Sequence, residues 1–431
     1  MKGDRLVVSQ RELQRWQLMG LVEVGKITLG EAAVTMGVSY RHAKRIRARV
    51  KVEGVKGVVH RNRGRPSPRR TPEPIRERVL ELSWGPYEGF NDSHFTEQLV
   101  DHYGIALSRE TVRKLRRAAG IAAKQKHKAR RHRKRRERKA QEGLMVLWDG
   151  SPHQWFGPEH PPCCLLPALD DATGKVLAAR FFPFEGSAAY LWLLHRVVSD
   201  YGIPLSIYQD CHGALRRNDS HWSLQEQLAG RQEPTQVGMA LESLGIEPIF
   251  ALSPQAKGRI ERLFGTLQDR LIAELKLAGI STMEAANAFL ETTFIAEFNR
   301  RFAVAPRESQ KAWHRLPQGL DLNRIISFHY RATVGNDNTV KLGGIVIDIP
   351  EGPCRRSYAK AKVEVRQLLD GSWRIYYGDT LIATHPSTAL REPLRALQRK
   401  KYHTKGAQSY CWVYLASAPN GYGEQLISTM R

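Results

Sequence analysis

Three carboxylates stand at positions where an acid can take part in catalysis. Residues 145–148 form an apolar run that predicts a buried strand, and Asp149 follows it directly. A second apolar run, residues 205–209, ends in the same way at Asp210, and Glu261 lies near the start of a predicted long helix. These three side chains are therefore the candidates for a shared site.

The chemistry that fits three converging carboxylates is the binding of divalent cations. Bare carboxylates in one place repel one another, and Mg²⁺, which prefers hard oxygen ligands, relieves that repulsion. Two Mg²⁺ ions, for which Mn²⁺ can substitute, activate an attacking oxygen and stabilise the leaving oxygen in phosphodiester chemistry. In this interpretation Asp149 bridges the ions, while Asp210 and Glu261 hold one ion each. The alternative for each acid taken singly is a turn residue at a strand end or a surface charge.

The elements that must position these acids follow from the order of the apolar runs. Five strands are predicted, three as a meander and two each preceded by a helix, over residues 145–149, 163–169, 176–184, 205–210 and 246–252. This order predicts an α/β domain with a mixed five-stranded sheet, in which Asp149 and Asp210 end neighbouring strands. Gly150 and Pro152 should stop the first strand after its acid. The competing acids, Asp170 and Asp171, belong to an Asp-Asp-Ala-Thr-Gly hairpin turn, and we interpret them as structural.

The first part of the chain, residues 1–60, has the pattern of a DNA-binding helical domain. A helix is expected over residues 10–23, a capping box starts a second helix at Thr28, and Ser39 caps a third, basic helix after a turn at Gly37. Helix, glycine turn and basic helix are typical of a helix-turn-helix, whose second helix enters the major groove. The alternative is a three-helix bundle whose basic face is only solvated. The expected DNA contacts are Arg41, Lys44 and Arg45.

Residues 61–74 form a basic linker around an Arg-Gly-Arg-Pro sequence. Glycine lets the backbone lie close to DNA, and Arg63 and Arg65 can enter a narrow A·T minor groove, as in the core of an AT-hook. A linker that touches only phosphate explains the same residues equally well, so both interpretations stay open.

A second unit of the same design covers residues 75–122. Ser93 caps one predicted helix, Gly104 turns the chain, and Ser108 caps a basic helix. The run that follows, residues 123–140, is too charged to pack and predicts a basic arm that tracks DNA with a steep salt dependence; a solvated segment is its alternative. The expected DNA contacts on the basic helix are Arg109, Arg113, Lys114 and Arg116.

The overall charge agrees with a nucleic-acid partner. Lys and Arg total 67 against 43 Asp and Glu, a formal net charge of +24, and a chain this basic usually binds a polyanion rather than being merely soluble. No run is long and apolar enough to span a bilayer, and no signal-like segment is recognised. The five cysteines form no C-x-x-C pair, so neither a zinc cage nor a disulfide framework is expected. We therefore expect a cytoplasmic, nucleoid-associated protein.

The pattern changes after the core domain, which is expected to occupy residues 141–315. Residues 330–390 show short apolar runs separated by the hairpin signals Asp370-Gly371 and Gly378-Asp379, which predicts a small β-barrel. Residues 391–431 form a basic, aromatic tail. The expected strands of the barrel cover residues 340–349, 362–369, 373–377 and 380–384.

Four segments together resemble the DDE transposases of bacterial insertion sequences, in particular the ISNCY-like group of the integrase superfamily. They are Trp-Asp-Gly-Ser-Pro-His from Trp148, Ala-Leu-Asp-Asp-Ala-Thr-Gly from Ala168, Tyr-Gln-Asp from Tyr208, and Ser-Pro-Gln-Ala-Lys-Gly-Arg-Ile-Glu-Arg from Ser253. The resemblance covers nearly the whole chain. It implies an RNase H-like core with Asp149, Asp210 and Glu261 as catalytic acids on two Mg²⁺ ions, and binding to the terminal inverted repeats of a mobile element. Lys257 and Arg259, beside the third acid, are further expected DNA contacts.

The sequence departs from this family in two places. The interval between Asp210 and Glu261 is longer than in the compact integrases, and its excess, residues 211–234, is polar and aperiodic; we interpret it as an inserted loop. In addition, the second acid is followed by Cys211 and His212, an unusual sequel. Either side chain could touch the site, although a plain loop role is the simpler interpretation.

Three functions fit these features. The first is a DNA transposase, a DDE-type polynucleotidyl transferase in which water frees a 3′-hydroxyl that then attacks target DNA. The second is a transposase-derived DNA-binding regulator without catalysis, against which the three intact acids argue. The third is a structure-selective nuclease without strand transfer. Because two element ends need two active sites, at least a dimer on double-stranded DNA is expected.

Overall fold

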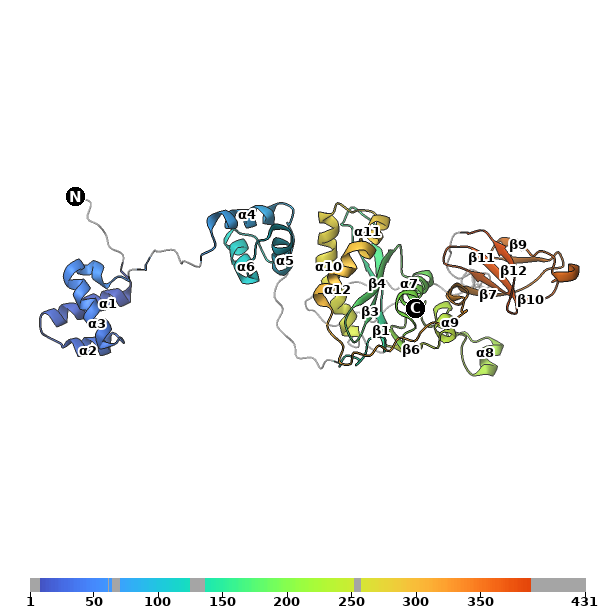
Figure 1. Cartoon of the computed structure of the whole chain (residues 1–431), viewed down its shortest axis with the longest axis horizontal. Coiled ribbons are helices and arrows are strands. Elements are labelled where there is room, and N and C mark those ends of the chain that lie inside the picture. Colours follow the sequence, from blue (N-terminus) through green and yellow to red (C-terminus); the bar gives the residue numbers. More distant parts are fainter. Residues whose placement is uncertain (1–7, 61, 64–69, 125–135, 252–256, 389–431) are drawn as a thin grey trace, which may run out of the picture. The chain divides into compact units, whose positions relative to one another are not determined.

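The computed structural model describes residues 8–60, 62–63, 70–124, 136–251 and 257–388 (Figure 1). The chain divides into two compact units, Met1–Leu80 and Glu81–Arg431. Arg65, most of the basic arm and the basic tail lie outside the described residues. Within the described ranges, no helix is both long and apolar enough to cross a membrane.

The first three helices of the chain begin where the sequence predicts. They are α1 (Gln10–Glu23), α2 (Leu29–Thr35) and α3 (Tyr40–Glu53). The Thr28 hydroxyl accepts a hydrogen bond from the Glu31 backbone N–H at 3.2 Å, and the Ser39 hydroxyl accepts one from that of His42 at 3.3 Å. Gly37, in the turn between α2 and α3, has φ +61°, a left-handed conformation that glycine adopts at little cost. The predicted helix starts and turn are confirmed.

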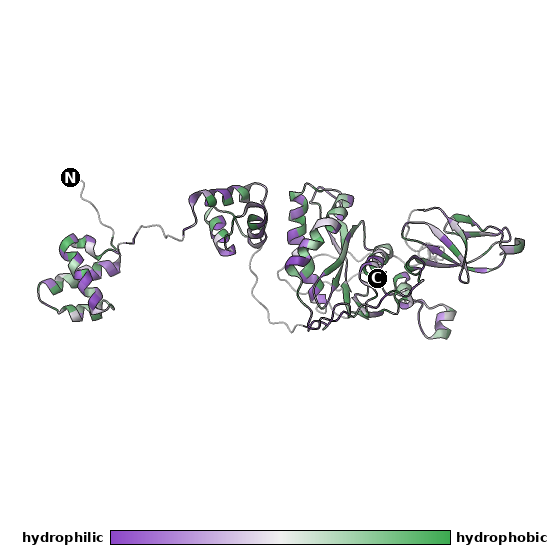
Figure 2. Ribbon diagram, in the orientation of Figure 1, coloured by the Kyte–Doolittle hydropathy of each residue, from purple (hydrophilic) through white to green (hydrophobic). Residues whose placement is uncertain are grey.

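The predicted basic contacts of α3 lie on the side of the helix away from its core. Ala43 and Ile46 are fully buried, whereas Arg41, Lys44 and Arg45 are exposed. The three cations are spaced at i, i+3 and i+4, which places them on one face of the helix. Figure 2 shows the same division, with hydrophilic residues along much of this helix.

Three further helices follow, namely α4 (Glu73–Trp84), α5 (Asp92–Tyr103) and α6 (Arg109–Ala118). Gly104 ends α5 with φ +64°, and the Ser108 hydroxyl caps α6 by accepting the Thr111 backbone N–H at 3.1 Å, as predicted. The cap of α5 is a correction, because it is Asn91 and not Ser93. The side-chain oxygen of Asn91 accepts the backbone N–H three residues later at 2.8 Å, so the helix begins two residues earlier than expected.

Arg116 is a second correction, because its side chain is not available to DNA in this structure. It is 3% exposed, and its guanidinium donates to the Asp92 carboxylate at 2.7 Å and to the Phe90 carbonyl at 3.0 Å. The reason lies in the helical repeat, since Arg116 follows the buried Val112 by four residues and shares its inward face. The other three predicted contacts on α6 are exposed, and Arg113 pairs with Glu110 beside it at 2.7 Å.

A mixed six-stranded sheet forms the core of the second unit. Its strands are β1 (Val146–Trp148), β2 (Ser151–His153), β3 (Cys163–Asp170), β4 (Val176–Phe182), β5 (Ser206–Gln209) and β6 (Glu247–Phe250). Strands β1, β3 and β4 pair antiparallel in the order β1-β3-β4, whereas β1, β5 and β6 pair parallel. This arrangement agrees with the predicted meander followed by two parallel strands, and it fits an RNase H-like core.

The sheet has one strand more than the five predicted. The first strand does break at Asp149 and Gly150, but pairing resumes at Ser151 instead of stopping at Pro152. Strand β2 pairs with the first half of β3 while β1 pairs with its second half, so both lie along the same side of β3. Proline is tolerated there because β2 is an edge strand and Pro152 has no N–H to leave unpaired.

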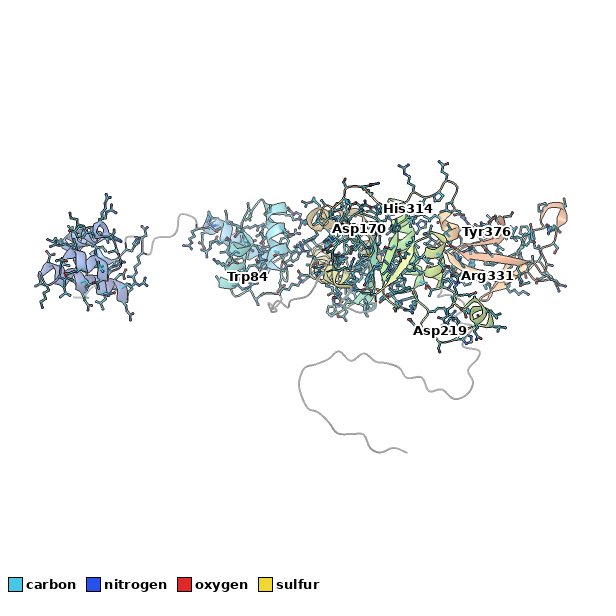
Figure 3. All side chains as sticks on the ribbon, turned by 90° about the horizontal axis from the view of Figure 1, so that it is seen from below. Trp84, Asp170, Asp219, His314, Arg331 and Tyr376 are labelled. Atoms are coloured by element: carbon cyan, nitrogen blue, oxygen red, sulfur yellow. The ribbon has the colours of Figure 1, made fainter. Side chains whose placement is uncertain are left out.

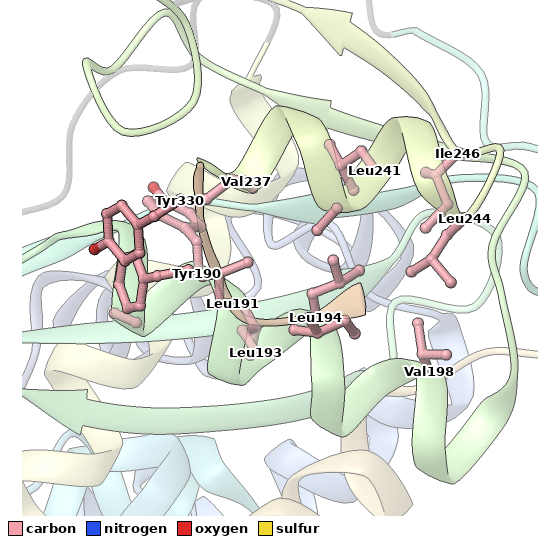
Figure 4. Close-up of a cluster of buried hydrophobic side chains, with 14 of the residues drawn as sticks. Tyr190, Leu191, Leu193, Leu194, Val198, Val237, Leu241, Leu244, Ile246 and Tyr330 are labelled. Atoms are coloured by element: carbon pink, nitrogen blue, oxygen red, sulfur yellow. The ribbon is translucent and has the colours of Figure 1, made fainter. Parts of the chain in front are cut away.

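Helices cover both faces of this sheet. On one face lie α7 (Ser187–Tyr201) and α9 (Gln236–Ser243); on the other lie α10 (Gly258–Leu277), α11 (Met283–Phe289) and α12 (Ile295–Phe302), with one π-helical turn at Leu290–Phe294. Val146 and Trp148 pack with the first group, part of which is shown in Figure 4, and Met145 and Leu147 pack with the second. Successive residues of β1 therefore support opposite layers, as the period of two in a strand requires.

Charged side chains attach α5 to this second layer. The Glu97 carboxylate accepts two hydrogen bonds from Arg270 of α10, at 2.6 and 2.9 Å, and one from Arg301 of α12 at 2.6 Å. The buried His94 ring lies 2.6 Å from the Glu274 carboxylate of α10. Within the second unit, α5 is thus bound to the helices of the sheet domain.

The interval interpreted as an inserted loop contains a short helix, α8 (Leu224–Ala229). Ser223 and Glu226 form a capping box at its start, and Glu226 also binds Arg217. Part of the predicted inserted loop, residues 211–234, is therefore helical. Six residues are fewer than two helical turns, so hydrophobic periodicity could not identify the helix.

The last described residues form an open sheet and a separate hairpin. The sheet order is β12 (Thr380–His385), β11 (Trp373–Tyr377), β10 (Lys362–Gln367) and β7 (Phe328–Thr333), and the hairpin is β8 (Thr339–Leu342) with β9 (Ile345–Asp348). Strands β7 and β12 are the two ends of the sheet order, so the small β-barrel is not confirmed. The run predicted as one strand over 340–349 is divided by Gly343 and Gly344, both at positive φ. A short helix, α13 (Leu322–Ile325), precedes β7.

Substitution of Arg116 by methionine should destabilise the second unit by about 2–3 kcal/mol, because it removes charge-assisted hydrogen bonds from a buried position. Thermal or urea unfolding of the full chain measures the change. Lys114→Met, two residues away on the exposed side of α6, is the matched control and should stay within about 0.5 kcal/mol of the wild type. Equal stability of the two variants would contradict the buried role.

Strands β1 and β5 are joined by a buried side-chain hydrogen bond, in which the Trp148 indole N–H donates to the Gln209 side-chain oxygen at 2.9 Å. Trp148→Phe should cost about 1–3 kcal/mol, because the Gln209 oxygen is left buried without its donor. Trp84→Phe is the control, since Trp84, labelled in Figure 3, is 58% exposed. Unfolding of both variants by denaturant tests this, and a Trp148→Phe variant as stable as Trp84→Phe would exclude the proposed link.

Candidate active site

Parallel pairing of β1 and β5 brings Asp149 and Asp210 to the same edge of the sheet. The register places Leu147 opposite Tyr208. Continuing that register by two residues sets Asp149 opposite Asp210, where both strands have just ended. The predicted convergence of these two acids is therefore present in the structure, and it follows from strand direction and register.

The two carboxylates meet at a single cation, the ammonium group of Lys257. Its Nζ lies 3.0 Å from Oδ1 of Asp149 and 3.0 Å from Oδ2 of Asp210. Lys257 occupies the N-cap position of α10, so the start of that helix is joined to the ends of β1 and β5. We predicted Lys257 as a DNA contact, and in this structure its charge is instead engaged by the two acids.

The surroundings of Asp149 oppose its ionisation. Burial is the largest influence and raises the pKa of Asp149 to about 6; Lys257 acts in the opposite direction, and the charges of Asp210 and Glu185 add to the rise. Burial by itself would lower the pKa of Lys257, but the two aspartates outweigh it, and the pKa is raised. The negative charges at this sheet edge thus stabilise a cation between them.

Glu185 is an acid of this site that the sequence interpretation missed. It is 18% exposed and accepts a hydrogen bond from the Tyr190 hydroxyl at 2.6 Å. A side chain at Gly150 would collide with the Glu185 carboxylate, so glycine beside Asp149 makes room for this acid. The order and direction of the strands could have indicated that Glu185 lies at this edge. Strand β4 runs in the same direction as β1, since each is antiparallel to β3, and Glu185 follows β4 at the edge where Asp149 follows β1.

Glu261 is the predicted acid that the structure does not bring into the cluster. It lies in the first turn of α10 and is exposed. Among the described residues, no group of three acids, histidines or cysteines is close enough to hold one metal ion. Glu261 nevertheless lies on the side of α10 that faces this sheet edge. Lys257, four residues before it, binds Asp149, and Gln268, seven residues after it, donates to the Ser151 hydroxyl at 3.4 Å.

The two acids interpreted as structural are fully buried and bound by protein donors. Asp170, labelled in Figure 3, accepts hydrogen bonds from the backbone N–H groups of Gly143 and Thr173, at 3.0 and 2.8 Å. Asp171 pairs with Arg136 at 2.5 Å and with Arg259. Arg259 is therefore a correction, because its guanidinium is bound to Asp171 and only 12% of its side chain is exposed, so it does not present a free charge to DNA.

Of the two residues that follow Asp210, His212 contacts the acids of the site. The backbone N–H of His212 donates to Oδ1 of Asp210 at 2.8 Å, and its ring Nδ1 lies 3.7 Å from the Glu185 carboxylate. Cys211 accepts a weak hydrogen bond from Arg216 and makes no described contact with an acid of the cluster. Of the two open possibilities, the structure places His212 against the acids and leaves Cys211 in the loop.

Arg63 is the remaining predicted contact in the first unit for which the structure gives a position. Its guanidinium donates to the Glu12 carboxylate at 2.7 Å, while 43% of its side chain stays exposed. Arg63 is therefore partly neutralised by its own unit, in contrast to the exposed cations of α3.

Comparison with known proteins gives close relatives of one kind. No family model matches the chain. It is 34% identical over 367 residues to the putative transposase y4bF of Sinorhizobium fredii, covering 85% of this chain and 79% of the relative. It is 29% identical over 434 residues to the transposase for insertion sequence IS1202 of Streptococcus pneumoniae, covering 91% of each.

Solved structures show a weaker likeness. The intasome of simian T-cell lymphotropic virus in complex with PP2A regulatory subunit B56 gamma is 15% identical and covers 73% of this chain and 100% of its own, with a TM-score of 0.30, which is too low to support an argument. The sequence relatives, which match along most of their length, decide the assignment. The chain belongs to the same transposase family as these relatives.

Proposed function

We propose that this protein is an active transposase that binds the terminal inverted repeats of its mobile element and catalyses Mg²⁺-dependent DNA strand cleavage and strand transfer. The observation that supports this most directly is the convergence of Asp149 and Asp210 on one cation at the end of two parallel strands. Carboxylates at such an edge are the usual holders of Mg²⁺ in phosphoryl-transfer sites.

The side chains at this edge fit a divalent cation. Asp149 and Asp210 direct oxygen atoms at the same point, and carboxylate oxygen is the donor that Mg²⁺ prefers. Lys257 pairs with Asp149 and Asp210, and Glu185 adds a further negative charge near Asp149, so the cluster retains negative charge that a divalent cation would balance. Asp149 and Asp210 would hold Mg²⁺, with Glu261 as the third acid in the bound state. Such an ion supplies charge stabilisation for in-line attack on a phosphodiester.

Other residues of the chain position the acids of the proposed site. Trp148 and Gln209 fix the spacing of the two strands that carry the acids. The Tyr190 hydroxyl orients Glu185, and the His212 backbone N–H orients the Asp210 carboxylate. For Glu261 to join the other two acids, its carboxylate must reach the sheet edge, which the side chain of Lys257, four residues earlier, already reaches.

Exposed cations on two helices are the proposed DNA contacts. Arg41, Lys44 and Arg45 on α3, and Arg109, Arg113 and Lys114 on α6, lie on outward faces. Recognition helices of this size each read only a few base pairs, so two of them lengthen the site that is recognised. The net charge of +24 adds a sequence-independent attraction that weakens with salt. Two element ends require at least two protomers on DNA.

Asp149→Asn, Asp210→Asn and Glu261→Gln should each abolish Mg²⁺- or Mn²⁺-dependent nicking of a supercoiled plasmid that carries the element ends, because each removes a proposed metal ligand. Binding to the terminal repeats, measured by gel shift, should stay within about twofold of the wild type. Glu284→Gln, an exposed acid on α11, is the matched control for Glu261→Gln and should nick normally.

The same assay separates the alternatives. Wild-type protein that binds the repeats without nicking them is a DNA-binding regulator, and nicking without joined products identifies a nuclease. Full nicking by Glu261→Gln alone would remove Glu261 from the catalytic set and leave the two aspartates.

The contribution of Glu185 can be tested through its neighbour. Gly150→Ala places a methyl group against the Glu185 carboxylate and should displace it, lowering Mn²⁺ affinity several-fold with little loss of stability, because the displaced atoms end a flexible side chain. Gly213→Ala is the control, since a methyl group there meets no atom within 4 Å. Calorimetric titration of both variants with Mn²⁺ measures the effect. An unchanged Mn²⁺ affinity in Gly150→Ala would show that Glu185 does not contribute to the metal site.

A further inference from the structure

Lys257 occupies the point where the two aspartates meet. Its ammonium is equidistant, at 3.0 Å, from one oxygen of each carboxylate. Only 14% of the Lys257 side chain and 16% of the Asp149 side chain are exposed, so the contact is largely shielded from water. It is therefore stronger and less screened by salt than an exposed ion pair.

The charges at this edge explain why the ammonium is held there. Asp149, Asp210 and Glu185 are close enough for their charges to influence one another, and the pKa of Asp149 is raised by burial and by both other acids. Partly buried carboxylates without a counter-charge are strongly unfavourable. Lys257 is the only cation among the described residues that forms an ion pair with either aspartate. In the absence of a divalent ion, this one side chain stabilises the pair.

A divalent ion and the Lys257 ammonium cannot share this position. Both are cations, and a divalent ion would be held by the same two carboxylates, whose facing oxygens, Oδ1 of Asp149 and Oδ2 of Asp210, are bound to Lys257. A divalent ion held between the aspartates would replace both ion pairs of Lys257, and the loss of these pairs would lower the apparent metal affinity. Lys257 has a long flexible stem and begins α10, so its head can leave the acids while its backbone stays in place.

We propose that Lys257 is a built-in counter-cation that holds the two aspartates together until a divalent metal ion displaces it. The inference rests on the proposed metal site and adds a residue that sets its affinity. Lys257 can then have both the role seen in the structure and the role predicted from the sequence. Once released from the acids, its ammonium becomes free to pair with a DNA phosphate beside Glu261, which is the DNA contact that the sequence predicted. In this exchange a divalent metal ion takes the place of the Lys257 ammonium between the aspartates, and Lys257 binds DNA.

The test is titration of the full-length, DNA-free protein with Mn²⁺, by calorimetry or by electron paramagnetic resonance of free Mn²⁺. Lys257→Met should bind Mn²⁺ at least about tenfold more tightly than the wild type, since close charge pairs of this kind are worth a tenfold factor or more. Lys276→Met, at an exposed position near the end of the same helix, is the matched control and should bind like the wild type. Unchanged or weaker binding by Lys257→Met would overturn the proposal.

A second measurement covers the effect on folding. Without metal, Lys257→Met should melt roughly 2–4 °C below the wild type, because its two carboxylates lose their counter-charge. Saturating Mn²⁺ should raise the melting temperature of Lys257→Met more than that of the wild type. Lys257→Gln, which is neutral but polar, repeats both measurements if the methionine variant does not fold. An equal rise in melting temperature with Mn²⁺ in the variant and the wild type would contradict the displacement of Lys257 by metal.

Asp149→Asn separates failure of this inference from failure of the proposed function. Mn²⁺ binding that persists in Asp149→Asn places the ion elsewhere and removes both the metal site and the exchange. Mn²⁺ binding that is lost in Asp149→Asn but identical in Lys257→Met and the wild type leaves the metal site intact and removes only the role of Lys257.

Discussion

The parallel pairing of β1 and β5 is the constraint on which the candidate site depends. Two acids separated in the chain by β2, β3, β4 and α7 become direct neighbours because the strands that carry them run in the same direction and end at the same level. The buried hydrogen bond between Trp148 and Gln209 holds that register one residue before the acids. A slip of one residue would turn one carboxylate to the opposite face of the sheet, so packing of both faces protects the geometry.

Placing acids together creates an electrostatic problem that the surrounding residues resolve in different ways. Asp170 and Asp171 are more deeply buried than Asp149. Their oxygens are bound by backbone N–H groups and by arginines, so these two acids have a structural role. Asp149, Asp210 and Glu185 accept fewer hydrogen bonds, and one lysine lies between the two aspartates. The residual negative charge distinguishes a site that can accept a cation from acids that only stabilise a turn.

The basic residues divide in the same manner. Arg116 and Arg259 are arginines in basic segments, and by composition alone each resembles a DNA contact. Each is instead bound to an aspartate inside the protein, which stabilises the fold and leaves little charge for a ligand. Arg41, Lys44 and Arg45 have no acid beside them on α3, so their charge is available at the surface of the first unit. Burial and ion pairing, not residue type, separate these two groups.

Local patterns were sufficient to predict most elements from the sequence. Caps at Thr28, Ser39 and Ser108, the glycine turns, and the apolar runs that end in Asp149 and Asp210 depend on residues close in the chain, so hydrogen bonding and burial at short range determine them. Features without a local period were missed, namely the short helix α8, the resumption of pairing at Ser151, and the division of the 340–349 strand at two glycines. Closure of the last sheet depends on pairing between distant strands, and the predicted barrel is an open sheet.

For the acids, too, local sequence determined some features and tertiary contacts determined the others. The sequence by itself placed Asp149 and Asp210 at strand ends, because a carboxylate that follows an apolar strand lies at a sheet edge wherever the strand pairs. Only the tertiary structure showed that Glu185 joins them, that Lys257 lies between them, and that Glu261 stays exposed. Those three facts depend on which strands run in the same direction and on where the first turn of α10 meets the sheet, and contacts between residues far apart in the chain decide both.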